Sequence, residues 1–130
     1  MAALSDYAEK LLLDFLMTTG TATRPTNWYV ALYTGAPSDS GGGTEVSAGG
    51  YARQSVSFNA ASSPGGTTSN SGEVSFTASG GDYGTVTHMG IFDASSSGNL
   101  LWHGALTASK TVADGDTLTF AVGNIDLTMA

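Results

Sequence analysis

The sequence predicts a mainly β protein: a β-sandwich, jelly-roll-like or closed into a small barrel, of seven or eight antiparallel strands with one N-terminal α-helix. Three observations lead to this fold class. Apolar residues follow helical spacing only near the N-terminus and alternate with polar residues in most later segments. Glycine makes up 18 of the 130 residues and gathers mostly between those segments, where turns are expected. The length suits one domain, residues 1–130.

Residues 5–17 (SDYAEKLLLDFLM) predict the helix, because this is the only long segment without glycine, proline or a β-branched residue. Ser5 or Asp6 is expected to cap its start, and Asp6 with Glu9 fits a capping box. Gly20 lies where the helix is expected to have ended.

The apolar stripe of this helix includes Leu12, Leu13 and Leu16, and it is wider than one sheet face would cover. Two interpretations follow. The helix either plugs the open end of the sandwich, or it packs part of the stripe on another subunit.

Three strands are expected next, at residues 27–34, 51–58 and 73–77, where aromatic and β-branched residues are frequent. The first is apolar on both faces, which indicates a central strand. Residues 35–50 and 59–72 are rich in glycine and serine, and we expect them to be flexible loops.

A hairpin is predicted over residues 82–105, with a Ser/Gly loop between its strands. Opposing Ile91 to Leu100 and Met89 to Trp102 places all four side chains on one face, which we expect to be the core face. A shift by one residue would turn the partner strand's apolar set outward, so the pattern favours this register.

The chain is expected to finish with three short strands. Residues 107–112 and 117–122 flank Asp114 and Gly115, a dipeptide that favours a tight hairpin turn. The alternation breaks near residue 123 and resumes over residues 125–129.

His88 and His103 face each other directly in the predicted register, about 5 Å apart at Cβ. A zinc site needs further ligands, and Asp82 and Asp93 lie at strand ends. We therefore expect no bound metal or other cofactor and treat the pair as a packing or contact feature.

Catalytic motifs are not evident in the sequence. The serines lie in glycine-rich loops without a G-x-S-x-G elbow. Glu73 is the one acid clearly inside a predicted core strand, so paired carboxylates for glycoside cleavage are not expected. These observations argue against an enzyme.

Composition excludes further classes. There is no cysteine, and the formal net charge is −7. The basic residues are scattered, so we expect no nucleic-acid partner. No apolar run reaches the ~18 residues of a membrane span, and the N-terminus lacks the basic segment of a secretory signal. Few charges and many small polar residues suit either a surface that packs on neighbours or a plain soluble β domain. The four basic residues are Lys10, Arg24, Arg53 and Lys110.

Four segments together resemble a family of small bacteriophage virion structural proteins, which are described as tail-fibre-like or as head decoration (cement) proteins. The likeness covers nearly the whole chain except the loop at 59–73. The segments are LSDYAEKLLLDFL, WYVALYTGAPSDSGGGTEVSAGGYARQSV, DYGTVTHMGIFDASSSGNLLWHGAL and KTVADGDTLTFAVGNIDLTM.

The resemblance implies a non-enzymatic component of the virion, assembled in the host cytoplasm. Capsid decoration is expected first, since the sequence shows no collagen-like, coiled-coil or β-helical shaft. In that role the protein would bridge capsid subunits and bind the head but not separated subunits. The alternatives are a tail or tail-fibre component in contact with the host, and a small lectin-like module that binds sugars through exposed aromatics. The aromatics that could serve a sugar site are Trp28, Tyr29, Tyr33 and Tyr51.

The expected partners are the major capsid protein or other virion proteins, together with further copies of the chain in a trimer or a dimer. Candidate contact residues come from the helix, the first glycine-rich loop and the hairpin edge. They are Leu12, Leu13, Leu16, Glu45, Val46, His88 and His103.

Overall fold

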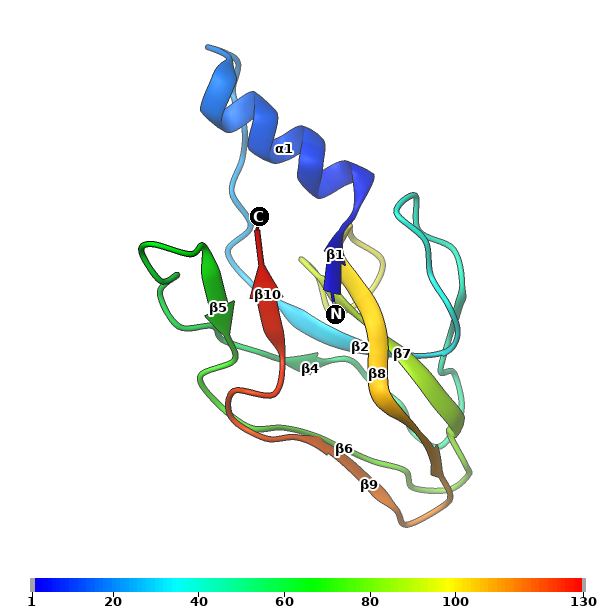
Figure 1. The fold of residues 1–130 in the computed structure, drawn as a ribbon. Helices are drawn as coiled ribbons and strands as arrows, with labels where there is room; N and C mark the ends of the chain where they lie inside the picture. Colours follow the sequence, from blue (N-terminus) through cyan, green and yellow to red (C-terminus); the bar gives the residue numbers. More distant parts are fainter. Residues whose placement is uncertain (1, 130) are drawn as a thin grey trace.

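The computed structural model of the protein describes residues 2–129. Figure 1 shows the arrangement of its one helix and ten strands in this part of the chain. The elements are β1 (Ala2–Leu4), α1 (Asp6–Met17), β2 (Tyr29–Gly35), β3 (Thr44–Glu45), β4 (Gln54–Ser55), β5 (Thr67–Ser69), β6 (Val74–Thr77), β7 (Gly84–Phe92), β8 (Leu100–Val112), β9 (Thr117–Phe120) and β10 (Asp126–Thr128).

The fold is mainly β and antiparallel, which confirms the predicted class. The largest sheet has six strands in the order β1-β8-β7-β2-β3, and β4 pairs with the same strand β2. Two further sheets have two strands each, β6 with β9 and β5 with β10.

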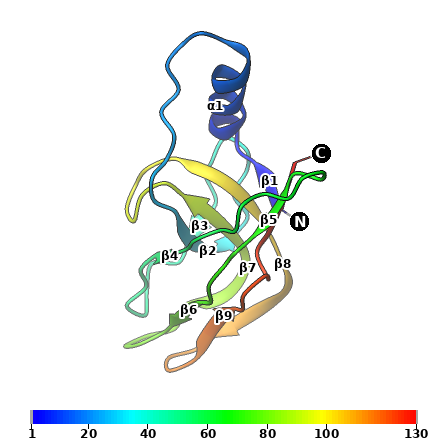
Figure 2. The ribbon, with the colours of Figure 1, turned by 90° about the vertical axis from the view of Figure 1, so that its left-hand side faces the viewer.

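The main core lies between the six-stranded sheet and the two small sheets, which face it as a second layer (Figures 1 and 2). Alternate residues of β6 and β9 point inward, because each strand places every second side chain on the same face. The large sheet contributes Val30, Leu32, Val86, Met89, Ile91 and Val112, and the small sheets contribute Val74, Phe76, Leu118, Phe120 and Leu127.

A second, smaller cluster lies on the other face of the large sheet. It consists of Ala31, Tyr33, Phe92 and Leu100, all buried. Gly90 lies among them: a Cβ added there would come within 2.9 Å of Leu100 Cδ1 and 3.1 Å of Tyr33 Cε1. The absent side chain therefore makes room for this cluster, and β2 is covered on both faces, as its apolar pattern predicts.

The hairpin of β7 and β8 exists, but its predicted register is wrong: the partner residues are shifted by two over residues 88–91 and by more over residues 84–86. Ile91 lies opposite Trp102, and Met89 lies opposite Gly104. A register shift between Ile91 and Phe92 then places Leu100 opposite Phe92, on the other face from Met89 and Ile91.

The hairpin loop explains this difference. The Asp93 carboxylate accepts hydrogen bonds from the backbone N–H of Asn99 (2.7 Å) and from its side-chain amide (2.9 Å). These bonds close the loop at Asn99, one residue later than the predicted pairing with Gly98, and the β-bulge adds the rest of the shift.

Three strands were not predicted: β1, β3 and β5. The segments 35–50 and 59–72, expected as loops, contain β3 and β5. The strands expected at the end of the hairpin and at 107–112 form the single 13-residue strand β8.

Helix α1 begins after Ser5, whose hydroxyl accepts a hydrogen bond from the backbone N–H of Ala8 (3.1 Å). Ser5 is thus the N-cap, and the capping box expected from Asp6 and Glu9 does not form. The helix ends at Met17, and the hydroxyl of the following Thr18 donates to the Asp14 carbonyl (2.8 Å).

A candidate assembly surface

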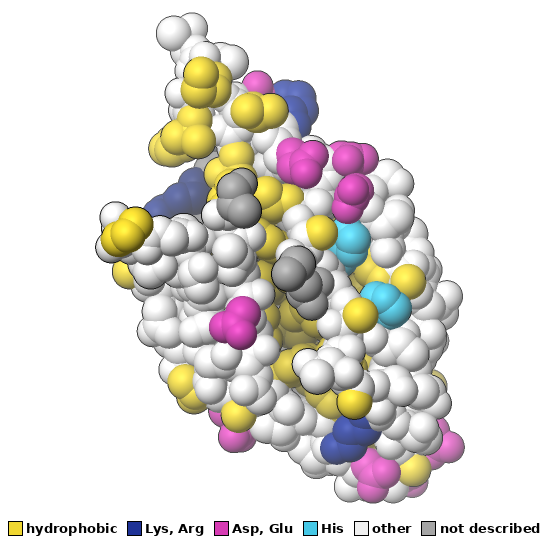
Figure 3. Space-filling view, in the orientation of Figure 1, with side chains coloured by type: hydrophobic (Ala, Val, Ile, Leu, Met, Phe, Trp, Pro, Cys, Tyr) yellow, Lys and Arg dark blue, Asp and Glu magenta, His cyan; other side chains and the backbone are white. Residues whose placement is uncertain are grey.

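Helix α1 projects from the sandwich, and its second half exposes large apolar side chains (Figures 1 and 3). Such side chains are usually covered in a folded protein, and a group of them on one element marks an interaction site. We call this group the helix-end patch; it consists of Leu13 (61% exposed), Phe15 (67%), Leu16 (68%) and Met17 (76%).

The hydrogen bonds that join the helix to the body lie at its start. The backbone N–H of Ser5 donates to the Leu101 carbonyl (2.9 Å), and the buried Ser5 hydroxyl donates to the Leu100 carbonyl. The Asp6 N–H donates to the Asp39 carbonyl (2.9 Å). Ala8 is the one fully buried residue of the helix. The helix therefore does not plug the sandwich, the first of the two roles considered for it.

The helix residues among the predicted contact residues differ in exposure. Leu12 is half-buried, whereas Leu13 and Leu16 are exposed. Phe15 and Met17, which also belong to the patch, were not among the predicted contact residues. The sequence shows both residues as apolar positions of the helix, but it does not show that the far end of the helix is open to solvent on more than one side.

The predicted contact residues of the first glycine-rich loop lie inside the fold. Val46 is 5% exposed and belongs to the main core, where its N–H donates to the Leu32 carbonyl (3.0 Å). The Glu45 carboxylate is held by Arg53 through Nε (2.9 Å) and Nη2 (3.0 Å), and by the Tyr51 hydroxyl (2.7 Å).

Arg53 connects this loop to the second apolar cluster. Its guanidinium lies 3.6 Å from the centroid of the Phe92 ring, close enough for a cation–π interaction. It also donates to the carbonyls of Ala94 (3.0 Å) and Ser97 (2.7 Å) in the hairpin loop. Its side chain is only 8% exposed, so this network holds two surface loops on the sheet.

The electrostatics of this network follow from burial and hydrogen bonding. Burial alone would raise the pKa of Glu45, but the hydrogen bonds from Arg53 and Tyr51 outweigh it, and the pKa lies below its ordinary value. Burial raises the pKa of Tyr33 to about 12, with a further contribution from the Glu45 charge. Burial and the bond to Glu45 also raise the pKa of Tyr51. The network thus contains one ion pair and neutral phenols near neutral pH.

The two histidines are not directly opposite each other, which corrects the predicted pairing. His88 lies opposite Ala105, and His103 lies opposite Gly90. The Nε2 of His103 is 2.7 Å from Oδ1 of Asp39, and the Nδ1 of His88 is 2.9 Å from the Thr87 hydroxyl. Within residues 2–129, no three His, Asp or Glu side chains are grouped so that they could hold a metal ion.

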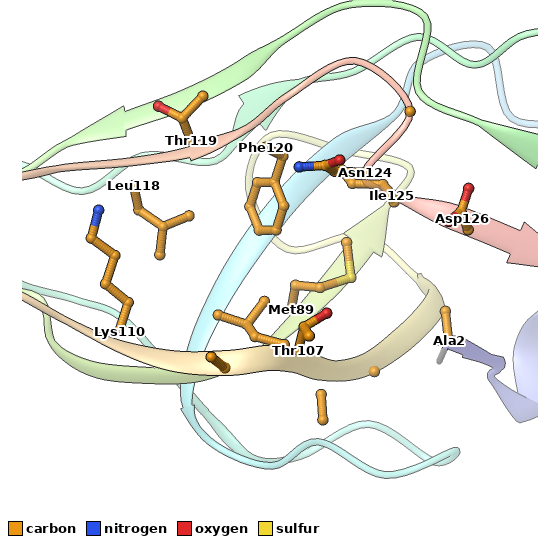
Figure 4. A pocket seen from close by; sticks show the side chains of 15 residues that line it. Ala2, Met89, Thr107, Lys110, Leu118, Thr119, Phe120, Asn124, Ile125 and Asp126 are labelled. Carbon is orange, nitrogen blue, oxygen red and sulfur yellow. The ribbon is translucent and has the colours of Figure 1, made fainter.

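A groove opens between β8 and the segment from β9 to β10 (Figure 4). Its volume is about 570 Å³. Its walls include the apolar side chains of Met89, Leu106, Leu118, Phe120 and Ile125. Figure 3 shows the corresponding hollow with apolar atoms inside it. Sequence reasoning missed this groove, because it arises from the spacing of strands that are not paired with each other.

A protein-family model described as "Podophage GP4 fiber I protein gp80" matches residues 3–128 of the chain. The protein belongs to this family of phage fibre proteins. No curated protein matches the sequence. The family match confirms the resemblance to phage virion proteins and places the protein in the virion as a structural component of the tail fibre.

This result changes the order of the expected roles. Capsid decoration was expected first and a tail-fibre component second, and the family match favours the tail-fibre component. A compact β fold without a shaft-like repeat is therefore compatible with membership of a fibre family.

The lectin-like alternative has little support in the geometry. Of the aromatics that would serve a sugar site, Tyr33 is 4% exposed, and the Tyr51 hydroxyl is used by Glu45 and by the backbone N–H of Leu32. Trp28 and Tyr29 are half-buried. No helix in the described part of the chain has the length and apolar character to cross a membrane.

Proposed function

We propose that this fibre-family protein is a non-enzymatic subunit that joins the fibre to its virion neighbours through the helix-end patch. The observation that carries the proposal is the exposure of Leu13, Phe15, Leu16 and Met17 on an element that projects from the body. Membership of the fibre family supports association with other virion proteins. We propose the helix-end patch as the surface that makes this contact.

The energetics support a partner for this patch. Covering a large apolar side chain is worth about 1.5–3 kcal/mol when the side chain goes from fully exposed to fully buried. Four such side chains on one helix end offer a compact anchor, although ordering and association costs reduce the net gain. Polar groups inside the body need no further partner: among residues 2–129, no buried side-chain nitrogen or oxygen lacks a hydrogen-bond partner.

The way in which the helix is joined to the body also favours binding of a partner at the patch. Its first turn is fixed to β8 by Ser5, and its second half is free of the body in the isolated chain. A partner that covers the patch would therefore meet a helix with one end already held in place, which lowers the ordering cost of binding.

The proposal is tested by changing Leu13 and Leu16 to Asp in the phage and counting copies of the protein per particle by quantitative mass spectrometry. Because two carboxylates would have to enter an apolar contact, we expect copies to fall by more than about tenfold. Ser95→Asp with Ser96→Asp is the matched control. It changes the net charge by the same −2, but both positions are exposed in the hairpin loop and lie outside the patch.

Circular dichroism of the purified variants checks that the fold is intact. Unchanged incorporation of the folded double variant would overturn the proposal. The same count tests the location, because a fibre subunit should be far less abundant than the major capsid protein, whereas a decoration protein would be of similar abundance.

A further inference from the structure

The helix-end patch lacks a partner within the described residues, and the groove beside β8 opens over apolar side chains of the main core. We propose that they are partners of each other between copies, so that the helix-end patch of one copy docks in the groove of a second copy. This inference rests on the proposed function only in using the same patch, and it names a second copy of the chain as the partner.

The groove has the chemistry that the patch requires. Leu118, Phe120 and Ile125 lie on one side of the groove and Met89 on the other, each 4–9% exposed. The half-buried Leu106 of β8 also lines the groove. An amphipathic or apolar helix lying in a groove of aliphatic and aromatic side chains is a common mode of recognition. The exposed β8 residues at the rim, among them Ala105 and Ala108, have small side chains that leave the entrance open.

A helix cannot reach the groove of its own chain in the observed structure. Ala2, at the start of β1, lines the groove, and the helix starts four residues later at Asp6. From there its 12 residues form a helix about 18 Å long. The helix leads away from the body (Figures 1 and 2). The patch therefore lies beyond the body, where a second copy is able to present its groove.

The charges of the two surfaces are complementary. The last turn of the helix has no basic residue, so the partial negative charge of its carbonyl end is not offset. Lys110 and Asp126 lie toward opposite ends of the groove in Figure 4. A helix with its C-terminal end near Lys110 would bring its own Lys10 toward Asp126. The charges thus favour one direction of the helix in the groove.

This contact is heterologous, because the two surfaces that meet are different. Such contacts form a closed ring when the rotation that relates neighbouring copies closes on itself, as in a trimer. A dimer closes when the two copies exchange helices reciprocally, which makes the whole interface two-fold symmetric. In either case every patch and every groove is covered. A stable interface buries about 800 Å² per partner, and each copy contributes two contacts toward that area.

Complementation between two defective variants tests the proposal on the full-length chain. Leu13→Asp with Leu16→Asp removes the patch, and Ala108→Trp blocks the groove. We expect the wild type to have a mass of two or three chains by light scattering, and each variant alone to be monomeric. A mixture of the two should form a one-to-one complex, because one intact patch and one intact groove remain.

Lys110→Glu is a second groove variant that adds no bulk. It should raise the dissociation constant between copies by about tenfold or less. The change should be smaller at high salt, because the interaction is electrostatic. Circular dichroism again confirms folding of each variant.

Three results would overturn the inference: a monomeric wild type at about 100 µM, far above typical working affinities; an unchanged oligomer for folded Ala108→Trp; or no complex in the mixture. A monomeric wild type whose incorporation into virions still requires Leu13 and Leu16 would reject docking between copies but keep the proposed function. The two failures are therefore distinguishable.

Discussion

The sandwich body and the end of helix α1 differ in how far their apolar side chains are covered. In the body, apolar side chains from two layers cover one another, and Phe76 is 1% exposed. At the helix end, Phe15 is 67% exposed although it is the same type of residue. The body is held by contacts within the chain, whereas the helix is held mainly at its first turn.

This difference indicates which part of the protein is complete in the isolated chain. Stability should depend on the body, and assembly should depend on the helix end. Substitutions of the same kind in the two regions can therefore separate folding from association.

The largest effect is expected for Phe76→Ala in the main core. Deleting this ring removes buried apolar area and leaves a cavity, so the free energy of unfolding should fall by about 3–5 kcal/mol. Urea unfolding followed by circular dichroism measures the change. A loss below about 1 kcal/mol would mean that the two layers are not packed as the structure shows.

Arg53→Met comes next, because it removes the guanidinium that joins Glu45, Phe92 and the hairpin loop. Hydrogen bonds to charged groups are worth about 1.5–3 kcal/mol, and we expect a loss of this size in the free energy of unfolding. Arg24→Met is the control, because it makes the same substitution at an exposed position, and it should change the free energy much less. Equal effects of the two substitutions would contradict the role of the network.

Ser5→Ala tests the joint between body and helix. It removes the N-cap acceptor and the buried hydroxyl that donates to the Leu100 carbonyl, so we expect a loss of about 1–2 kcal/mol. Ser40→Ala, at an exposed loop position, is the control. If both variants unfold like the wild type, the helix is not anchored at Ser5.

The pH dependence of stability offers a smaller test of the Arg53 network. The pKa of Glu45 is below its ordinary value in the folded state, so its stabilisation is present above about pH 5 and is lost as the pH falls through the folded pKa. Urea midpoints measured from pH 6 down to pH 3 should fall less steeply in Glu45→Gln than in the wild type. Parallel curves would exclude this contribution.

The smallest effect is expected for Phe15→Ala, which should change the free energy of unfolding of the monomer by no more than about 0.5 kcal/mol. Urea unfolding in dilute solution, where the chain is monomeric, is the appropriate measurement. A loss near that of Phe76→Ala would show that the helix end packs on the body, and the comparison would fail.

Sequence reasoning reached the parts of the fold that local patterns encode. Residues 5–17 have helical spacing, and the alternation in β6 and β9 predicts which of their side chains are buried. The pairing of β7 with β8 was found, but not its register, because a bulge and the Asp93–Asn99 bonds fix it.

Three of the short strands, β1, β3 and β5, could not be predicted from the sequence. β5 (Thr-Thr-Ser) lies in a low-complexity segment, and it is a strand because β10, nearly sixty residues later, pairs with it. β1 likewise depends on the exposed edge of β8. Such pairings are set by tertiary context rather than by residue preference.

The candidate site could be predicted only in part, because some of its features depend on tertiary contacts. Leu13 and Leu16 lie on an apolar stripe that the sequence shows, and they are exposed as a contact role requires. Nothing local to Val46 indicates that it is buried. The groove needs Met89, Leu118 and Ile125 from separate elements, so it exists only in three dimensions.

The short strand β1 has a mechanical consequence for a fibre. It runs antiparallel to β8, with Ala2 opposite Gly104 and Leu4 opposite Trp102, and it leads directly into the helix. The other end of the helix continues to β2, which is paired on both of its edges. Tension applied at the helix would therefore enter the large sheet at two strands. Hydrogen bonds perpendicular to those strands would carry an axial pull together rather than one after another.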